Sequence, residues 1–143
     1  MRYIGIDPGE RRLGVAVSDP EGRMAMPAEV IEESDPNAQV GAILAAARRH
    51  GAEAIVLGMP YTLRGEMGPA AQRVQAQVER LRQKTDIPVH TCDERFSSGI
   101  AQSVLRQAEA GHETRKRNVD KLAASIMLQS FLDRRAADGC SQT

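Results

Sequence analysis

Three acidic residues occupy positions that surface carboxylates rarely take. Asp7 ends the apolar segment YIGID, where strand alternation puts it on the same face as Gly5. Glu94 follows the apolar segment IPVHTC, and its neighbour Asp93 must face the other way if the strand continues. Asp120 lies at the head of a helical stripe of small and apolar residues. The chemistry open to such acids is metal binding, or a part in a loop that holds phosphate.

Each acid also has a purely structural explanation. Asp7 could accept backbone N–H bonds in a turn, Glu94 could pair with Arg95, and Asp120 could be a first-turn helix acid that balances the helix dipole. Inward-facing acids repel one another unless a cation neutralises them, and hard divalent ions prefer oxygen ligands. We therefore predict that Asp7, Glu94 and Asp120 hold Mg²⁺ or Mn²⁺ for phosphoryl chemistry, with Asp93 as the alternative second acid.

Basic residues flank the same positions, as binding to a nucleic-acid backbone requires. Solvated loop charge is the competing explanation. With two Phe, two Tyr and no Trp, the chain lacks the rings for a base-stacking platform, so contacts to the backbone are expected. The predicted nucleic-acid-binding residues are Arg12, Arg95, Lys116, Arg117 and Lys121.

The apolar pattern predicts the elements that position these residues. Strands are expected at 2–7, 13–18, 24–32, 52–60 and 87–92, and helices at 36–50, 69–84, 97–110 and 118–135. The basic segment HETRKRN reads as a loop before the last helix. Three strands joined by tight turns, followed by strands alternating with helices, predict an α/β fold with a mixed sheet.

Length and composition bound the function. A chain of 143 residues makes one domain, expected over 1–136 with a flexible tail at 137–143. Lys plus Arg and Asp plus Glu number 19 each, so any basic surface must be local. Two cysteines without metal-type spacing and the lack of a long apolar run favour a cytoplasmic protein with no membrane partner. No phosphate-binding loop or dinucleotide fingerprint is present.

Four segments carry a family resemblance. They are DPGERRLGVAVSD (7–19), GMPYTLRGEMGPAAQRV (58–74), DERFSS (93–98) and KRNVDKLAASIMLQSFL (116–132). In this order they resemble the YqgF family, also called RuvX, over nearly the whole chain. Members of that family have a ribonuclease H-like fold. They are described as Holliday junction resolvases and as nucleases that mature the 5′ end of the 16S ribosomal RNA precursor.

The resemblance implies a ribonuclease H-like sheet of five strands, an antiparallel three-strand meander plus two parallel strands, flanked by helices. It also implies catalytic roles for Asp7, Glu94 and Asp120. The sequence departs from the family at Glu10, where a hydroxyl residue is usual, and at Asn118, where a basic residue is common. Both departures bear on substrate preference more than on chemistry.

The implied activity is metal-dependent cleavage of phosphodiester bonds in structured RNA, with resolution of branched DNA as the alternative. Better-known resolvases carry a second acid three residues further along the last helix, where this chain has Ala123. A non-catalytic nucleic-acid-binding scaffold and an ATP-binding protein of the actin and sugar-kinase kind are the other hypotheses. Junction resolution needs paired sites and hence a homodimer, whereas RNA trimming suits a monomer.

Overall fold

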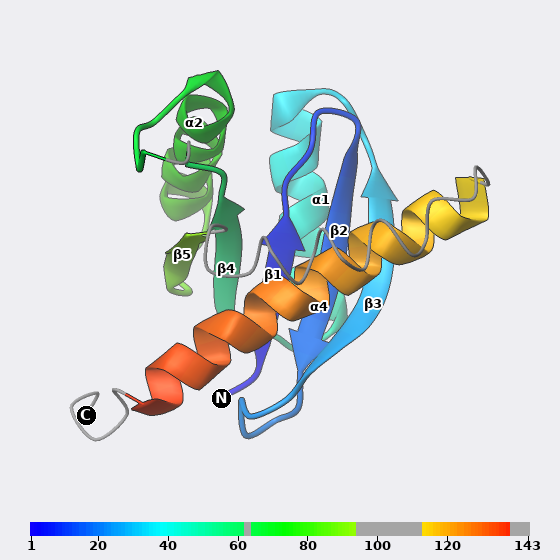
Figure 1. Cartoon of the computed structure of the whole chain (residues 1–143), viewed down its shortest axis with the longest axis vertical. Helices are drawn as coiled ribbons and strands as arrows, with labels where there is room; N and C mark the ends of the chain where they lie inside the picture. Colours follow the sequence, from blue (N-terminus) through cyan, green and yellow to red (C-terminus); the bar gives the residue numbers. More distant parts are fainter. Residues whose placement is uncertain (62–63, 94–112, 138–143) are drawn as a thin grey trace.

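The computed structural model describes residues 1–61, 64–93 and 113–137, with only the backbone of 113–118. Its elements form a five-stranded sheet in the order β3-β2-β1-β4-β5 (Figure 1). The strands are β1 (Tyr3–Asp7), β2 (Arg12–Ser18), β3 (Ala25–Glu32), β4 (Ala54–Met59) and β5 (Val89–Asp93), and the helices are α1 (Pro36–Arg49), α2 (Pro69–Lys84) and α4 (Glu113–Ala137).

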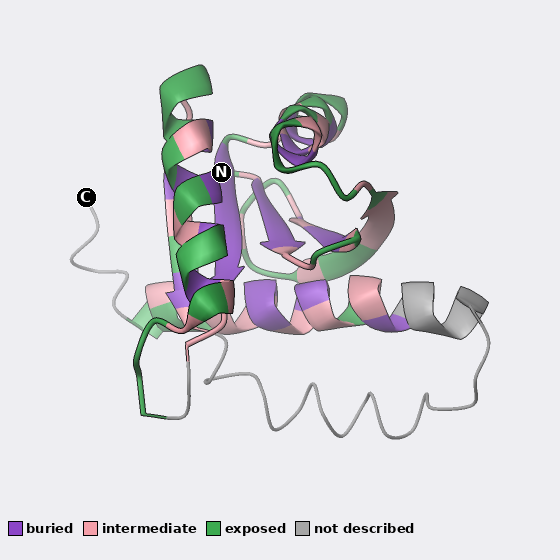
Figure 2. Cartoon of the chain, turned by 90° about the horizontal axis from the view of Figure 1, so that it is seen from above, coloured by how far each residue is buried: buried purple, intermediate pink, exposed green. Residues whose placement is uncertain are grey.

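The sheet is mixed, as predicted. β1, β2 and β3 form an antiparallel meander, while β4 pairs in parallel with β1 and β5 in parallel with β4. Helices α1 and α2 cover one face and α4 crosses the other (Figure 2). The helix expected at 97–110 and the end of the predicted tail, 138–143, lie outside the described residues.

Local signals account for the helix starts. The Asp35 side chain caps α1 by accepting the Ala38 N–H at 2.9 Å, and Pro36 occupies the first helical position, where no N–H is needed. Pro69 likewise occupies the first helical position of α2, after Gly68, which caps the helix without a side-chain hydrogen bond. These caps fix where both helices begin and therefore which residues face the sheet.

The two faces of the sheet differ in side-chain size. Toward α1 and α2 the strands present large aliphatic side chains, among them Ile4, Ile6, Leu13, Val15, Ile55 and Leu57. Toward α4 the central strands present mostly small ones, including Gly5, Gly14, Ala16 and Ala54. Because the small face leaves room, α4 packs closely on the sheet through the buried residues Ala124, Met127, Leu128 and Leu132.

Two glycines permit this close approach. A Cβ added at Gly14 would lie 2.0 Å from the backbone oxygen of Asp120, and one at Gly5 would lie 2.8 Å from the Cβ of Leu128. Neither distance is compatible with a real side chain. The position of α4, and of Asp120 on it, therefore depends on these two residues having no side chain.

The start of α4 corrects the sequence prediction. The segment expected as a basic loop before residue 118 is helical from Glu113 onward. Its residues are mostly good helix formers, and no Gly or Pro interrupts them, so local charge did not indicate a break. Asp120 consequently lies about two turns inside the helix, and the expectation that a helix start stabilises its charge is wrong.

The Gly14 contact predicts a specific sensitivity. Gly14→Ala should lower the free energy of unfolding by about 1–3 kcal/mol, because α4 must shift to admit the methyl group. The control is Gly41→Ala in α1, where an added Cβ meets nothing within 4 Å. That change should stabilise the helix by about 0.5–1 kcal/mol. Urea unfolding measures both, and equal effects from the two substitutions would contradict the packing argument.

Candidate active site

The proposed acidic residues are expected at one edge of the sheet, where the carboxyl ends of the parallel strands lie. Because β1, β4 and β5 are parallel, their carboxyl ends meet there, and the antiparallel β2 begins at the same edge. Asp7 is the last residue of β1, and Arg12 is the first of β2. Tyr3 packs in the core beneath α4, so strand alternation assigns Asp7 to the α4 side, as the sequence predicted.

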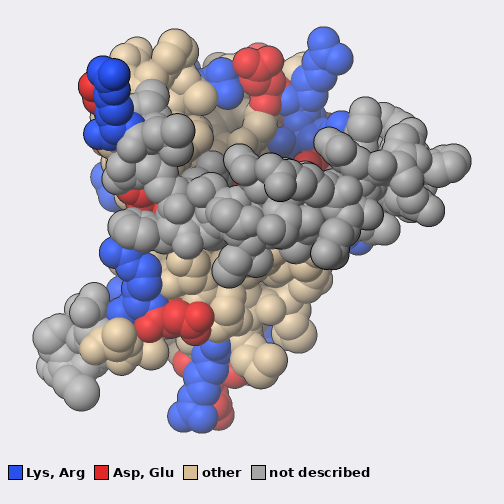
Figure 3. Space-filling model, viewed as in Figure 1, with Lys and Arg blue, Asp and Glu red and all other residues tan. Residues whose placement is uncertain are grey.

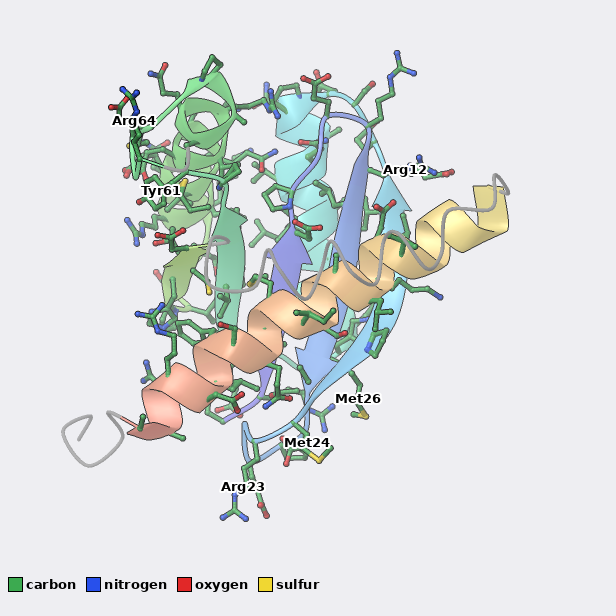
Figure 4. All side chains as sticks on the ribbon, viewed as in Figure 1. Arg12, Arg23, Met24, Met26, Tyr61 and Arg64 are labelled. Carbon is green, nitrogen blue, oxygen red and sulfur yellow. The ribbon has the colours of Figure 1, made fainter. Side chains whose placement is uncertain are left out.

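Helix α4 brings Asp120 to the same place. Asp7 is the strand partner of Gly14, and the backbone of Asp120 lies against Gly14. Asp120 is half-buried, and its Oδ2 is 3.6 Å from the Nε of Arg12. Figure 4 shows Arg12 at the start of β2 beside α4. Two of the three predicted acids and one predicted basic residue therefore come together from three elements.

The surroundings perturb the charge of Asp120. Burial raises the pKa of this carboxyl, and the negative charge of Asp7 raises it further, while the Arg12 guanidinium lowers it. The net result is a pKa above the ordinary value for aspartate. Holding the ionised carboxylate here costs free energy that the single arginine does not fully recover.

A buried pair of amides anchors the loop between Asp7 and Arg12. The Nε2 of Gln39 in α1 donates to the carbonyl oxygens of Gly9 at 3.2 Å, Glu10 at 3.3 Å and Glu33 at 2.6 Å. The Nε2 of Gln77 in α2 donates to Gln39 Oε1. Both glutamines are almost fully buried. Helices on one face of the sheet therefore hold the loop that positions charged groups on the other.

Sequence reasoning missed these glutamines. Gln39 and Gln77 each lie on the core-facing stripe of a helix, beside Val40 and Val78. A polar residue on such a stripe is a signal in itself, because burial requires it to have hydrogen-bond partners. Which carbonyls it would reach depended on how the helices pack.

Only some of the other predicted site residues lie in the described part of the structure. In β5, Val89 packs toward α1 and α2 whereas Cys92 packs toward α4, so alternation assigns Asp93 to the side opposite Asp7. Glu94 and Arg95 lie outside the described residues. The remaining predicted basic residues are on α4: Lys116 and Arg117, described as backbone only, and the half-buried Lys121.

Among the described residues, charges of both signs lie at this edge. Glu10 pairs with Arg73 of α2 at 3.3 Å, and Arg64, also at this end of the molecule, is exposed on the loop after β4 with the half-buried Tyr61 (Figure 4). Figure 3 shows both signs of charge around the margin of the α4 face. Within the described ranges, no three His, Cys, Asp or Glu side chains gather as metal ligands. In the same ranges, no helix is long and apolar enough to cross a membrane.

Proteins of one known family have sequences similar to this one. A family model described as "RuvX: Holliday junction resolvase" matches residues 1–134. A protein of Desulforudis audaxviator, named "Putative pre-16S rRNA nuclease", is 38% identical over 94% of this chain and 96% of its own length. A protein of Moorella thermoacetica with the same name is 36% identical over 97% and 99%.

Solved structures share the fold. RuvC of Thermus thermophilus, in complex with a Holliday junction substrate, matches with a TM-score of 0.59 at 20% identity, covering 95% of this chain and 96% of that one. The fowlpox virus Holliday junction resolvase matches with a TM-score of 0.54 at 11% identity, covering 94% and 99%. These similarities establish a ribonuclease H-like fold.

The fold and the sequence matches together define a nuclease of the ribonuclease H-like class. The chain belongs to the RuvX family, also called YqgF, whose members act on phosphodiester bonds. The resemblance drawn from the four motifs is thus confirmed, as is the predicted fold.

The raised pKa of Asp120 predicts a pH-dependent stability difference. The Asp120 carboxyl binds its proton more tightly in the folded protein than in the unfolded chain. Its ionisation therefore lowers the free energy of unfolding as pH rises through its pKa. Asp120→Asn should therefore increase the free energy of unfolding of the metal-free protein at neutral pH, and the gain should shrink by about pH 4. Urea unfolding at both pH values measures it. A loss of stability at neutral pH would mean that the Arg12 pair outweighs burial and repulsion.

The amide anchor gives a second prediction. Gln39→Met preserves much of the volume but leaves the loop carbonyls and the Gln77 amide without their partner, so the free energy of unfolding should fall by about 1–3 kcal/mol. Gln72→Met is the matched control, because the Gln72 amide also bonds a carbonyl, that of Met67 at 3.1 Å, but on the exposed surface. Equal effects of the two changes in chemical unfolding would refute the anchoring role.

Proposed function

We propose that this protein is a metal-dependent endonuclease that processes the 5′ end of the 16S ribosomal RNA precursor. The observation that carries the proposal is the convergence of Asp7 and Asp120 at one edge of a ribonuclease H-like sheet, with Arg12 between helix and hairpin. The substrate is inferred from the relatives named for pre-16S rRNA. Such a substrate agrees with the expected cytoplasmic location.

The donor set fits a hard divalent cation. Burial, and to a lesser extent the charge of Asp7, raises the pKa of Asp120, and a cation of higher charge than arginine would stabilise the two half-buried carboxylates. We infer that Glu94 is the third ligand, since Asp93 belongs by alternation to the opposite side of the sheet. Mg²⁺ and Mn²⁺ are the ions that such an oxygen set selects.

When bound, a divalent cation supplies Lewis acidity that activates a water and stabilises the leaving 3′ oxygen of the phosphodiester. Asp7, Glu94 and Asp120 would hold it. Arg12, which lies 3.6 Å from Asp120, would contact a phosphate oxygen of the substrate beside the metal. Arg95, Lys116, Arg117 and Lys121 remain the predicted contacts to the neighbouring backbone.

Holliday junction resolution is the second candidate, favoured by the description of the family model and by the fold shared with resolvases. The two activities make different demands. Symmetric junction cleavage needs two sites in a homodimer, whereas processing of one RNA strand can be done by a monomer. A scaffold role without cleavage would leave the paired carboxylates unexplained.

Removal of the first-strand acid tests the proposal. Asp7→Asn should reduce Mn²⁺-dependent cleavage of a precursor RNA by about 100-fold or more, because a metal ligand is lost while the shape is kept. The control is Glu21→Gln, an exposed acid in the β2–β3 turn paired with Arg23 at 3.6 Å. Gel assays of 5′ processing measure both. Full activity of Asp7→Asn would refute the proposed site.

A substrate comparison separates the two candidates. Purified protein is incubated with Mn²⁺ and either the precursor RNA or a four-way DNA junction, and its oligomeric state is recorded by light scattering. RNA cleavage by a monomer supports the proposal. Paired, symmetric cuts in the junction by a dimer, without cleavage of RNA, would overturn it in favour of resolution.

A further inference from the structure

A second basic cluster lies at the other end of α4. Arg82 of α2 donates to the carbonyl oxygen of Val89 at 2.8 Å, which fixes it beside the start of β5. The next residue, His90, stacks against Phe131 of α4 with ring centroids 5.5 Å apart. Arg135 lies over the same Phe131 ring at 6.0 Å. We call Arg82, His90 and Arg135 the distal basic patch.

Arg135 is held in a way that leaves its charge available. Its guanidinium lies over two rings, 5.7 Å from the centroid of Tyr3 and 6.0 Å from that of Phe131. These rings form an edge-to-face pair with centroids 5.8 Å apart. Among the described residues, no carboxylate forms an ion pair with Arg135. Aromatic packing thus fixes the side chain without neutralising it.

Two acids in the described part of α2 and α4, Glu79 and Asp133, leave Arg135 without an ion pair. Glu79 pairs only loosely with Arg82, at 3.8 Å on the exposed face of α2. Asp133 accepts a hydrogen bond from Gln129 at 2.9 Å. Burial lowers the pKa of His90, and the positive charges of Arg135 and Arg82 lower it further. Neither Glu79 nor Asp133 forms an ion pair with Arg135, so its guanidinium keeps its positive charge.

The patch is aligned with the proposed active site by α4 itself. The sheet-facing stripe of this helix begins at Asp120, continues through Ala124, Leu128 and Phe131, and ends at Arg135. Fifteen residues of α-helix rise about 22 Å. At about 3.4 Å per stacked nucleotide along one strand, that span corresponds to roughly six nucleotides. Figure 1 shows α4 crossing the sheet diagonally between these two ends.

We propose that the distal basic patch binds a backbone phosphate of the nucleic-acid substrate several nucleotides from the bond that is cut. A guanidinium stacked on rings still presents its N–H groups sideways, which is the geometry for a phosphate oxygen. The proposal rests on the proposed nuclease function for the identity of the ligand. It makes substrate length a determinant of affinity, and it explains how a chain of zero net charge holds a long polyanion.

The test is binding rather than cleavage. In the Asp7→Asn background, fluorescence anisotropy measures the Kd for a single-stranded RNA of about 20 nucleotides and for one of about 4, as a function of salt. Arg135→Gln should weaken binding of the long RNA several-fold and reduce its salt slope by about 0.7, the value for one lost phosphate contact on a single strand. The short RNA, which cannot span both ends of α4, should bind unchanged.

Two control variants keep the test decisive. Arg135→Lys keeps the charge and should preserve the salt slope. Arg23→Gln removes an exposed arginine at the β2–β3 turn, labelled at the lower end of Figure 4, and should leave both RNAs unaffected. Thermal unfolding of each variant shows whether the fold is intact.

Two results would overturn the patch. One is an unchanged Kd and salt slope for the long RNA with Arg135→Gln, and the other is an equal loss for both RNAs. Neither depends on catalysis, so an inactive parent enzyme would refute the proposed function while leaving this binding result interpretable.

Discussion

The contact between α4 and the β1–β2 hairpin is the constraint on which the rest of the structure depends. With no side chain at Gly14, the backbone of Asp120 rests directly on the hairpin, and Gly5 allows Leu128 the same closeness further along. A helix even slightly farther from the sheet would carry Asp120 away from Asp7. The site therefore depends on the absence of side chains at Gly5 and Gly14. Packing of α4 on the sheet, rather than attraction between the charged groups, holds it together.

This arrangement makes the ionised form of Asp120 unfavourable. Asp120 is kept half-buried beside another acid, with a pKa above its ordinary value, and among the described residues it is Arg12 that opposes the repulsion. On the opposite face, the large aliphatic core and the buried Gln39–Gln77 pair fix the loop that joins Asp7 to Arg12. The two faces of the sheet thus have separate tasks, one to stabilise and one to present charge. The distal basic patch extends the second task along α4.

The order of the strands and helices and the face on which Asp7 lies could be predicted from the sequence, for physical reasons. The period-two pattern placed Asp7 with Gly5, and the turn and cap residues gave the order of strands and helices. The predicted start of the last helix, at residue 118, was wrong, because charged residues do not by themselves end a helix when they are good helix formers. The roles of Gln39, Gln77 and Arg135 were not predictable, since each depends on contacts between segments far apart in the chain. The assignment of Glu94 still rests on its motif.

The most direct test of the central claim is the affinity of the protein for Mn²⁺, followed by electron paramagnetic resonance without nucleic acid. The account predicts that the parent protein and Glu21→Gln bind Mn²⁺ equally, and that Asp120→Asn binds it about 10–100-fold more weakly. This loss is expected even though the same substitution should make the metal-free fold more stable. Unchanged Mn²⁺ affinity in Asp120→Asn would contradict the claim that α4 completes a metal site at the end of β1.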